Sequence, residues 1–481
     1  MNDQIADWAI LVYMSADRVL ANFAVESLRQ LKRGAGTGII VLAQEASGKE
    51  KTQRYVFDKV SEPDKATNLI SSIEENRLGQ IEPAPSPGGI ADPRNLTEFI
   101  KWASRHPAKH RCLVLWGHGY ELLVNDDLSD GENASVEDKL EPPGEKPRKY
   151  LAPKNLRKAL EDARPFVGQL DIIGIDACSL SLVELATELA GCGNFLVASQ
   201  EEVPDTSFPY EQLLWKIKHH HSPDDVEGIC AAIPGLYVQS YRDYIVATDE
   251  GMREITLASL RLGNIAKITE PLTLLADALQ SAAFNPVRRK AVVKAREASR
   301  DFALGLFVDL RDFCGRLSKE LEACELKSAC EAVYKAIDAR GERACILENT
   351  TGDSPKTGCH GLSVYFPYLT DKAMEQAQSL APADQRPRLV KGGTNHLQKA
   401  RGMQISEIEK DFELLDKFEK TNWAEFIKRG WSVMLAAEKR DELDRHYSAQ
   451  QCAINLYSIL SQSTKQPQPA QVPQKAAAAI P

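Results

Sequence analysis

The chain has 481 residues, 43% of them hydrophobic and 26% charged, which is the composition of an ordinary soluble protein with a large core. Its formal net charge of −9 gives no reason to expect nucleic acid or a membrane as a partner. No segment approaches the roughly 18 apolar residues of a membrane span, and the acidic start shows no signal-peptide pattern. The ten cysteines match no zinc spacing, so we expect a reducing, cytoplasmic location, no metal and no other cofactor.

The first hundred residues alternate between predicted strands and helices. Short apolar runs predict buried strands at 8–14, 38–43 and 53–57. Asp92 and Pro93 predict the start of a helix, because Asp is a favoured N-cap and Pro a favoured first residue. The stripe of this helix that we expect to be buried comprises Leu96, Phe99, Ile100 and Ala103.

Two further predicted strands end in reactive side chains. The run at 113–116 leads to His118, and the run at 170–176 leads to Cys178. The neighbouring predicted elements are helices at 153–163 and 179–190 and a strand at 195–199. Such alternation is typical of an α/β fold, with a mostly parallel sheet that has helices on both faces.

Beyond residue 200, helices predominate in the prediction. Two are expected between residues 209 and 236, and more follow to residue 335. The remaining predicted elements are a strand at 244–248, two late strands at 344–347 and 361–366 that rejoin the sheet, and a charged helical stretch at 405–446. We therefore divide the chain into a domain at 1–400, a charged helical segment at 401–460 and a disordered tail at 461–481.

The two reactive strand ends suggest a nucleophile and its base. The carboxyl ends of parallel strands meet at one edge of a sheet, so His118 and Cys178 would lie there together. A neighbouring histidine or a helix N-terminus lowers a thiol pKa, and Cys178 directly precedes a predicted helix. His118 would then act as general base and acid, while glycine N–H groups beside it could bind an oxyanion. A buried cysteine and an unrelated loop histidine explain the same pattern equally well.

Two acidic residues accompany this pair. Asp176 could cap the helix that follows, or it could face a pocket and bind a cationic substrate side chain. Asp205 could be a second acid from a nearby loop. Both interpretations of Asp176 remain open on the residues alone.

Nine short segments, in this order and spacing, resemble the clostripain-like cysteine peptidases, relatives of caspases, gingipains and legumains. The segments are Leu11–Asp17, Asp92–Ile100, Leu115–Gly119, Asp171–Cys178, Val197–Glu201, Phe208–Tyr210, Val308–Leu310, Gly361–Pro367 and Thr421–Trp423. Together they cover roughly residues 8 to 430. The resemblance implies a caspase-like peptidase domain at 1–400, with a helical C-terminal addition.

The same resemblance implies a role for each site residue. His118 would be the catalytic histidine, Cys178 the nucleophile, and the N–H groups of Gly119 and Cys178 the oxyanion hole. Asp176 and Asp205 would line the pocket for the residue before the cut, which implies cleavage of proteins and peptides after Arg or Lys. The match at Asp205 is looser, because the family usually shows Gly-Asp-Gly-Trp-Pro-Tyr where this chain has Pro-Asp-Thr-Ser-Phe-Pro-Tyr.

The polar stretch at 121–150 is predicted to be a mobile loop. Family members are commonly activated by a cut after the histidine, so the basic residues Lys146, Arg148 and Lys149 are candidates for cleavage by the protein itself or by another protease. An ordinary basic patch is the alternative. The acidic run at 126–137 half-matches a calcium-binding loop, and some relatives need calcium, so Ca²⁺ is the one metal ion that the sequence brings into question.

We therefore expect a cytoplasmic cysteine endopeptidase, kept inactive as a zymogen and used in regulatory or antiviral defence proteolysis. An amidotransferase would need a second glycine after the nucleophile, which the segment from Asp176 to Leu180 lacks. A non-catalytic scaffold that binds a protein partner through the charged C-terminal helices is the remaining alternative.

Overall fold

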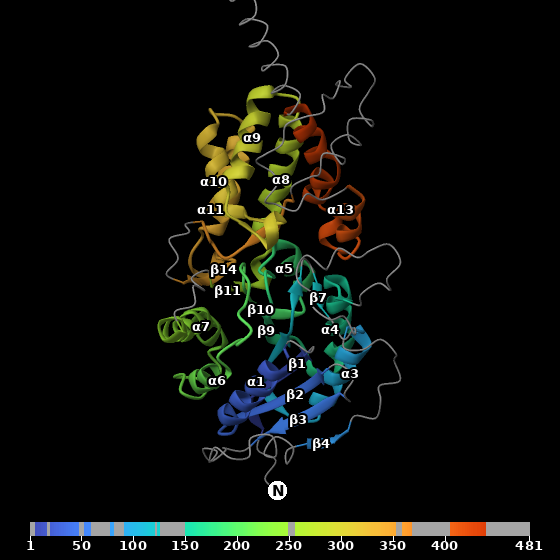
Figure 1. Cartoon of the computed structure of the whole chain (residues 1–481), viewed down its shortest axis with the longest axis vertical. Coiled ribbons are helices and arrows are strands. Elements are labelled where there is room, and N and C mark those ends of the chain that lie inside the picture. The colour runs from blue at the N-terminus through green and yellow to red at the C-terminus, as the bar shows by residue number, and fades with distance from the viewer. Residues whose placement is uncertain are drawn as a thin grey trace, which may run out of the picture.

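A twisted central sheet runs through the computed structural model of the chain (Figure 1). The structure describes residues 5–16, 20–47, 52–58, 77–80, 91–120, 123–125, 150–248, 255–352, 358–367 and 405–438. Within these ranges, nine strands form the sheet in the order β14-β11-β10-β9-β5-β1-β2-β3-β4. Their bounds are β1 Ala6–Ala16, β2 Ile39–Ser47, β3 Gln53–Phe57, β4 Arg77–Gln80, β5 Ala108–Trp116, β9 Leu170–Asp176, β10 Gly193–Ala198, β11 Thr256–Arg261 and β14 Ile346–Thr351.

The middle of this sheet is parallel and its edges are antiparallel. Strands β2, β1, β5, β9 and β10 pair in parallel, whereas β3, β4, β11 and β14 pair antiparallel to their neighbours. The predicted α/β class, a mostly parallel sheet between helices, is confirmed. The five parallel strands are apolar over most of their length because both of their faces are covered.

Helices cover both faces of the sheet, and on each face their buried side chains pack with those of the strands into one hydrophobic cluster. One cluster contains α1 Ala21–Gly34, α6 Tyr210–Lys218 and α7 Val226–Thr248. The other contains α3 Pro93–Ala103, α4 Pro153–Val167, α5 Val183–Leu189 and α8 Ala266–Ala282. The remaining long helices, α9 Pro286–Ala298, α10 Leu310–Glu320, α11 Glu325–Ile337 and α13 Ile405–Phe412, gather with α8 at one end of the molecule (Figure 1).

Helix α3 follows the sequence prediction in detail. Asp92 accepts a hydrogen bond from the backbone N–H of Arg94, and Pro93 occupies the first turn. The buried residues are the expected stripe of Leu96, Phe99, Ile100 and Ala103. The N-terminal cap and the helical periodicity were therefore sufficient to place this helix.

Three predicted elements are wrong. Residues 244–248 belong to the end of α7 rather than to a strand, because a short apolar run has no period that distinguishes a strand from a helix. Residues 361–366 do not rejoin the central sheet. Their strand β15 Ser363–Tyr365 pairs with β13 Phe307–Asp309, which in turn pairs with β12 Asp301–Phe302. The third error is the start of helix α5, which lies beside the candidate site.

The C-terminal segment packs against the rest of the core. Trp423, in α14 Asn422–Glu425, is fully buried, and its ring contacts that of Phe366 at a centroid distance of 5.3 Å. Its indole N–H also donates to the Tyr365 carbonyl at 3.1 Å. The predicted boundary at residue 400 stays a prediction, and the tail at 461–481 lies outside the described residues.

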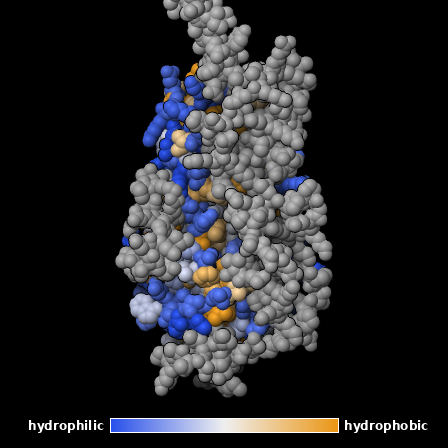
Figure 2. Space-filling model, in the orientation of Figure 1, coloured by the Kyte–Doolittle hydropathy of each residue, from blue (hydrophilic) through white to orange (hydrophobic). Residues whose placement is uncertain are grey.

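The surface mixes polar and apolar residues. Hydrophilic residues predominate among the coloured atoms in Figure 2, and hydrophobic ones form smaller areas between them. Single exposed apolar side chains such as Trp215 and Phe284 are normal on a protein surface. No helix within the described ranges is both long and apolar enough to cross a bilayer.

Candidate active site

His118 and Cys178 leave the sheet at the same edge, as predicted. Strands β5 and β9 are parallel neighbours in which Trp116 pairs with Asp176. The backbone N–H of Gly117 donates to the Asp176 carbonyl at 3.2 Å and extends this pairing by one residue. His118 and Cys178 each lie two residues beyond the paired positions, so the register brings the two segments together.

Gly119 lies directly against the backbone of Cys178. A Cβ atom on Gly119 would lie 2.2 Å from the carbonyl oxygen of Cys178 and 2.5 Å from its backbone nitrogen. No side chain fits at that distance, so glycine is what permits the segment after His118 to approach the cysteine. The nearby backbone N–H of Gly119 also lowers the pKa of the Cys178 thiol.

The chain makes a tight turn after Cys178 instead of entering a helix. Ser179 has a φ of 56°, which is left-handed and uncommon for a residue with a side chain. Its N–H donates to the Glu201 carbonyl at 3.0 Å, and the Ser181 N–H donates to the Ser199 carbonyl at 2.8 Å. Helix α5 begins only at Val183, so the predicted start at residue 179 is wrong. The helix therefore neither lowers the thiol pKa of Cys178 nor is capped by Asp176.

The thiol of Cys178 is half-buried beneath Val203. The backbone N–H of Val203 donates to Sγ at 3.3 Å, and the thiol points back to the Val203 carbonyl at 3.7 Å. Burial raises the pKa of Cys178, and the carboxylates of Glu202 and Asp205 raise it further. The N–H groups of Val203 and Gly119 oppose this rise without cancelling it. The thiol is therefore protonated near neutral pH in this conformation.

Asp176 is buried with its two carboxylate oxygens in different environments. Oδ2 accepts hydrogen bonds from the Ser207 hydroxyl, from the Phe208 N–H at 3.1 Å and from the Tyr210 hydroxyl at 2.6 Å. Oδ1 is also buried and has no hydrogen-bond partner among the described residues. Burial raises the pKa of Asp176 to about 6 although its three donors lower it. One oxygen of this buried carboxylate is thus left without a hydrogen-bond donor from the described residues.

The loop that carries Asp205 is held by α7. The Tyr241 hydroxyl donates to the Ser207 carbonyl at 2.6 Å and accepts from the Thr206 hydroxyl at 2.9 Å. Asp205 itself is exposed, as is Glu202. Glu202 is not among the residues predicted for the site. Its position directly before the loop of Asp205 is the signal in the sequence that could have identified it.

A buried polar network behind the site was also missed. Gln200 donates to the carboxylate of Asp309 at 3.0 Å and to the Ser363 hydroxyl at 2.8 Å, and it accepts from the Gly361 N–H at 2.7 Å. These contacts join three of the segments that carry the family resemblance. Each segment places a polar residue within an apolar run, but sequence order alone does not reveal that these residues meet.

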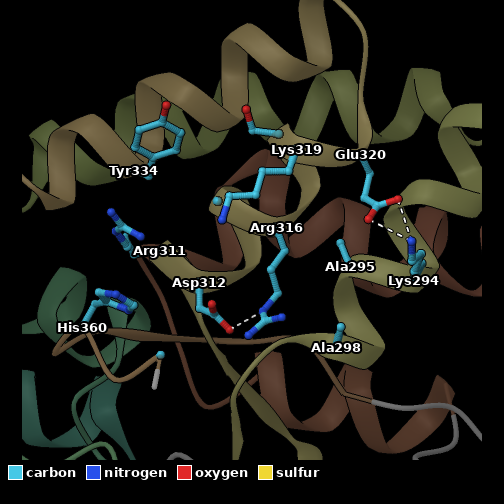
Figure 3. Close-up of a pocket in the computed structure, with 13 residues that line it drawn as sticks. Lys294, Ala295, Ala298, Arg311, Asp312, Arg316, Lys319, Glu320, Tyr334 and His360 are labelled. Atoms are coloured by element: carbon cyan, nitrogen blue, oxygen red, sulfur yellow. Dashed lines mark hydrogen bonds and ion pairs between the residues drawn. The ribbon is translucent and has the colours of Figure 1, made fainter. Parts of the chain in front are cut away.

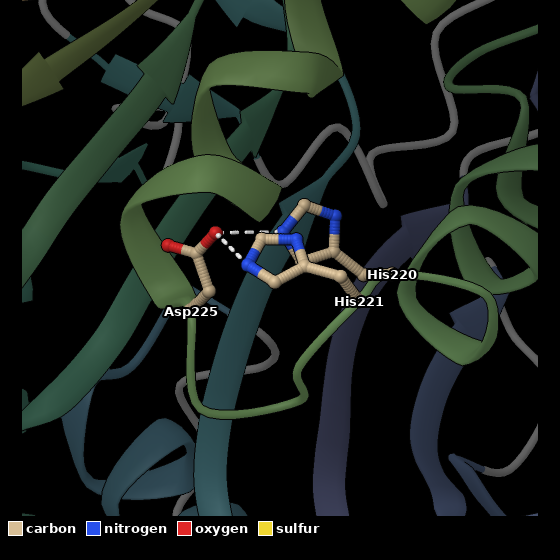
Figure 4. A group of neighbouring side chains, drawn as sticks. All are labelled: His220, His221 and Asp225. Carbon is tan, nitrogen blue, oxygen red and sulfur yellow. Dashed lines mark hydrogen bonds and ion pairs between the residues drawn. The ribbon is translucent and has the colours of Figure 1, made fainter.

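Each of the three consecutive histidines that follow α6, His219 to His221, has a hydrogen-bond or ion-pair partner. His219 bonds to the Trp215 carbonyl at 2.8 Å and caps the helix. His220 and His221 both bond to one oxygen of Asp225, at 2.8 and 3.2 Å (Figure 4). Among the described residues, this is the one group of three metal-binding side chains, and its atoms lie within 4.8 Å of one another. Because the carboxylate already pairs with both rings, the contacts account for the group without an ion.

Two further predicted sites lie outside the described residues. These are the candidate cleavage positions Lys146, Arg148 and Lys149 and the half-matched calcium loop at 126–137. The ends of the predicted loop are described, however. Strand β7 Leu123–Asn125 pairs with β8 Tyr150–Leu151 on one side and with β6 Gly119–Tyr120 on the other.

Comparisons with known proteins agree with this architecture. The model of the family described as "Clostripain family" matches residues 12–431. An X-ray structure of an inactive zymogen C11 protease from Parabacteroides distasonis is 18% identical, with a TM-score of 0.52 over 76% of this chain and 93% of that chain. A secreted C11 cysteine protease from Bacteroides thetaiotaomicron, solved with an irreversible peptide inhibitor, is 16% identical, with a TM-score of 0.49 over 78% and 97%. A search of curated proteins found no match.

Proposed function

The chain belongs to the clostripain family and is a cysteine peptidase, and from this premise we propose that it cleaves proteins after Arg or Lys through His118 and Cys178. The observation that carries the proposal is the contact of Gly119 with the Cys178 backbone. Together with the register of β5 and β9, this contact brings the histidine segment to the cysteine.

The reaction follows the chemistry of an activated thiol. His118 takes the proton from Cys178, the thiolate attacks the scissile carbonyl, and the amine leaves with a proton from the imidazolium. Water then hydrolyses the thioacyl-enzyme. We assign the oxyanion hole of both steps to the N–H groups of Gly119 and Cys178, and the support is that the two backbones lie in contact.

We assign the preference for a basic residue to Asp176, with Asp205 as a second acid. Support comes from the buried oxygen Oδ1 of Asp176, which has no partner among the described residues and lies two positions before the nucleophile. A guanidinium or ammonium group would satisfy that oxygen. Glu202 and Asp205 both act electrostatically on the thiol of Cys178, so they add negative potential near the same place.

We further propose that the single chain is a precursor activated by a cut near Lys146–Lys149. Val203 covers the thiol in the uncut chain, and one solved relative is described as an inactive zymogen. The pairing of β7 with β8 ties the ends of the loop together, and β6 begins at Gly119, so a cut between them could act on the oxyanion hole. Equally intact chains of wild type and Cys178→Ala, with the wild type fully active, would end this idea.

A cytoplasmic location and a role in regulatory or antiviral defence proteolysis are part of the proposal. The nine cysteines that the structure describes are all free, which favours a reducing compartment. Fractionation of cells that produce the protein tests the location, since recovery outside the cytoplasm would contradict it.

The alternative is a non-catalytic scaffold that binds a protein partner. The observation in its favour is the raised pKa of the half-buried Cys178 thiol, which disfavours the reactive form. Activity of the purified protein distinguishes the two functions.

The decisive experiment offers fluorogenic peptides that end in Arg, Lys or Asp, alongside free glutamine, to wild type, Cys178→Ala and His118→Ala. We expect cleavage after Arg and Lys, reduced by at least about 10³-fold in both variants. Cys324→Ala is the matched control because this half-buried cysteine lies at the start of α11. Preference for Asp would contradict the pocket assignment, and no cleavage after proteolytic nicking would favour the scaffold.

A further inference from the structure

A cavity of about 630 Å³ opens among helices α9, α10 and α11 (Figure 3). These helices lie at the opposite end of the molecule from α6 (Figure 1). The cavity wall is built from α9, α10 and α11 and from the segment that leads into β15. The side chains that define its chemistry are Lys294, Arg311, Arg316, Lys319, Tyr334 and His360. None of them takes part in the reaction proposed above.

Positive charge predominates in the cavity although the chain as a whole carries −9. Four Lys and Arg residues line it against two carboxylates, those of Asp312 and Glu320. Asp312 pairs with Arg316 at 2.7 Å, and Glu320 pairs with Lys294 at 2.8 Å. Lys319 has no ion-pair partner within the described part of the chain. Arg311 pairs with Asp338, which does not line the cavity, at 2.8 Å. Among the described residues, Lys319 is therefore one unpaired cation of the cavity wall before His360 is counted.

His360 is a further group of the cavity wall that can carry a positive charge, and it is paired with Asp309. Burial lowers its pKa, but its ring nitrogen bonds to the buried carboxylate of Asp309 at 3.0 Å, and the net effect is a raised pKa. The imidazole thus gains positive charge more readily than a free histidine. It faces the cavity from the side opposite to Glu320 (Figure 3).

Shape and wall chemistry fit a small molecule with an apolar part. The volume falls in the range of small-molecule sites. Tyr334, Ala295 and Ala298 provide an apolar surface beside the charges, and the Arg311 guanidinium lies 5.8 Å from the centre of the Tyr334 ring. Guanidinium groups and lysines arranged around one space are the side chains that bind phosphate oxygens best.

The cavity wall connects to the loop over the Cys178 thiol. His360 and Gln200 bond to the same buried carboxylate, that of Asp309. Gln200 begins the segment that ends at Val203, whose backbone covers the thiol. A second connection runs through Arg300, which pairs with Glu201 and whose N–H bonds to Asp312 at 2.9 Å. An anion that draws His360 towards the cavity, or that competes with Asp312 for Arg316, would therefore disturb this segment.

We propose that the cavity binds a small phosphate-bearing molecule, and that its occupant changes the activity of Cys178 through Asp309 and Gln200. The proposal that the cavity binds such a molecule depends on the cavity alone. The proposal that binding changes the activity of Cys178 rests on the proposed peptidase function.

Binding is tested on Cys178→Ala, so that catalysis plays no part, by calorimetry and thermal melting with inorganic tripolyphosphate and with ATP. We expect saturable binding that weakens by at least about tenfold in Lys319→Glu and in Lys294→Glu, since each removes one cation and adds an anion. Lys290→Glu is the matched control, because this exposed lysine lies one turn before Lys294 on the same helix, outside the cavity. Binding that is absent, or equally weakened in the control, would overturn the proposal, as would stronger binding of a triglutamate peptide.

The proposed effect of the occupant on Cys178 is tested by measuring kcat/KM for cleavage of an arginine peptide with and without tripolyphosphate. We expect a change of several-fold that is lost in Lys319→Glu and kept in Lys290→Glu. Binding without any change in kcat/KM would contradict the link to Cys178. If wild type cleaves no peptide at all, the proposed function fails while the calorimetry still decides the binding.

Discussion

At the scale of single residues, the site depends on unusual backbone. Ser179 directly follows the candidate nucleophile with a φ of 56°, and Ser207, which donates to Asp176, has a φ of 71°. Left-handed conformations of non-glycine residues cost about 1–3 kcal/mol each and persist where surrounding contacts enforce them. Here those contacts are the carbonyl of Glu201 and the hydroxyl of Tyr241. The strain is therefore concentrated beside the thiol and beside the pocket acid.

Gly119→Ala should lower kcat/KM on the order of 100-fold, because its Cβ would force the histidine segment away from Cys178 by about 1 Å. Gly263→Ala is the control, since a Cβ there meets nothing within 4 Å. Peptide cleavage and a thermal melt of both variants check the prediction. A fully active Gly119→Ala would show that the contact is dispensable.

The pKa of about 6 for Asp176 predicts pH-dependent binding of cations. The carboxylate is ionised above this value, so the affinity of Cys178→Ala for arginine amide should rise up to about tenfold per pH unit below pH 6 and level off above it. Calorimetry between pH 4.5 and 8 measures this. Asp176→Asn should show weak affinity with no such rise, and an identical pH profile in the two proteins would exclude Asp176 from the pocket.

The same acid should reduce stability at neutral pH. Its folded pKa is raised from 3.8 to about 6, so the folded state binds the proton more tightly. The stabilisation from that proton is complete below pH 3.8 and lost as the pH rises through about 6. At pH 8 the free energy of unfolding of Asp176→Asn, measured by urea unfolding, should therefore exceed that of the wild type by up to about 3 kcal/mol. At pH 4 the two proteins should have similar free energies of unfolding. A destabilised variant at pH 8 would contradict this sign.

At the scale of elements, α7 does more than cover the sheet. Its residue Tyr241 holds the loop of Asp205 by two hydrogen bonds, while the hydroxyl of Tyr237, one turn earlier, is buried without a partner among the described residues. The helix therefore offers a matched pair of tyrosines with opposite hydrogen-bonding status.

Tyr241→Phe should cost about 1–2 kcal/mol of stability and raise the KM for arginine peptides, because the loop of Asp205 loses its anchor. Tyr237→Phe should be neutral or stabilising, since no hydrogen bond is lost. Urea unfolding and steady-state kinetics of both variants test the difference. Equal losses in the two variants would show that the loop does not depend on α7.

At the scale of the whole molecule, the described C-terminal segment completes the core of the preceding residues. Besides Trp423, the fully buried side chains Phe412, Phe418 and Trp431 come from this segment. Trp431 stacks edge-on against Phe366 at a centroid distance of 4.7 Å and donates to the Pro367 carbonyl at 2.8 Å. The family match also continues through this segment, to residue 431.

Trp423→Ala should lower the free energy of unfolding by about 3–5 kcal/mol and keep a single transition, because the ring fills the core of the preceding residues. Trp215→Ala, at a side chain that is 59% exposed, is the control and should change little. Urea unfolding followed by circular dichroism measures both. A separate early transition in Trp423→Ala would support an independent unit after residue 400.

The sequence by itself determined the elements with strong local signals. The apolar strands that end before His118 and Cys178, the cap of α3 and the α/β class all follow from periodicity and end residues, which act over a few positions. The sequence also predicted that His118 and Cys178 lie at the same edge of the sheet, because the carboxyl ends of parallel strands lie on one side.

Only the tertiary structure decided the contacts between distant segments. Neither the turn at Ser179 nor the meeting of Gln200 with Asp309 has a local signal, since each depends on a partner outside its own element. The hydrogen bond from the Val203 N–H to the Cys178 thiol has no local signal either, because it also joins two separate segments. The physical reason is that hydrogen-bond partners and burial are fixed by packing after the elements form, and packing is what sets the pKa of Cys178 and Asp176.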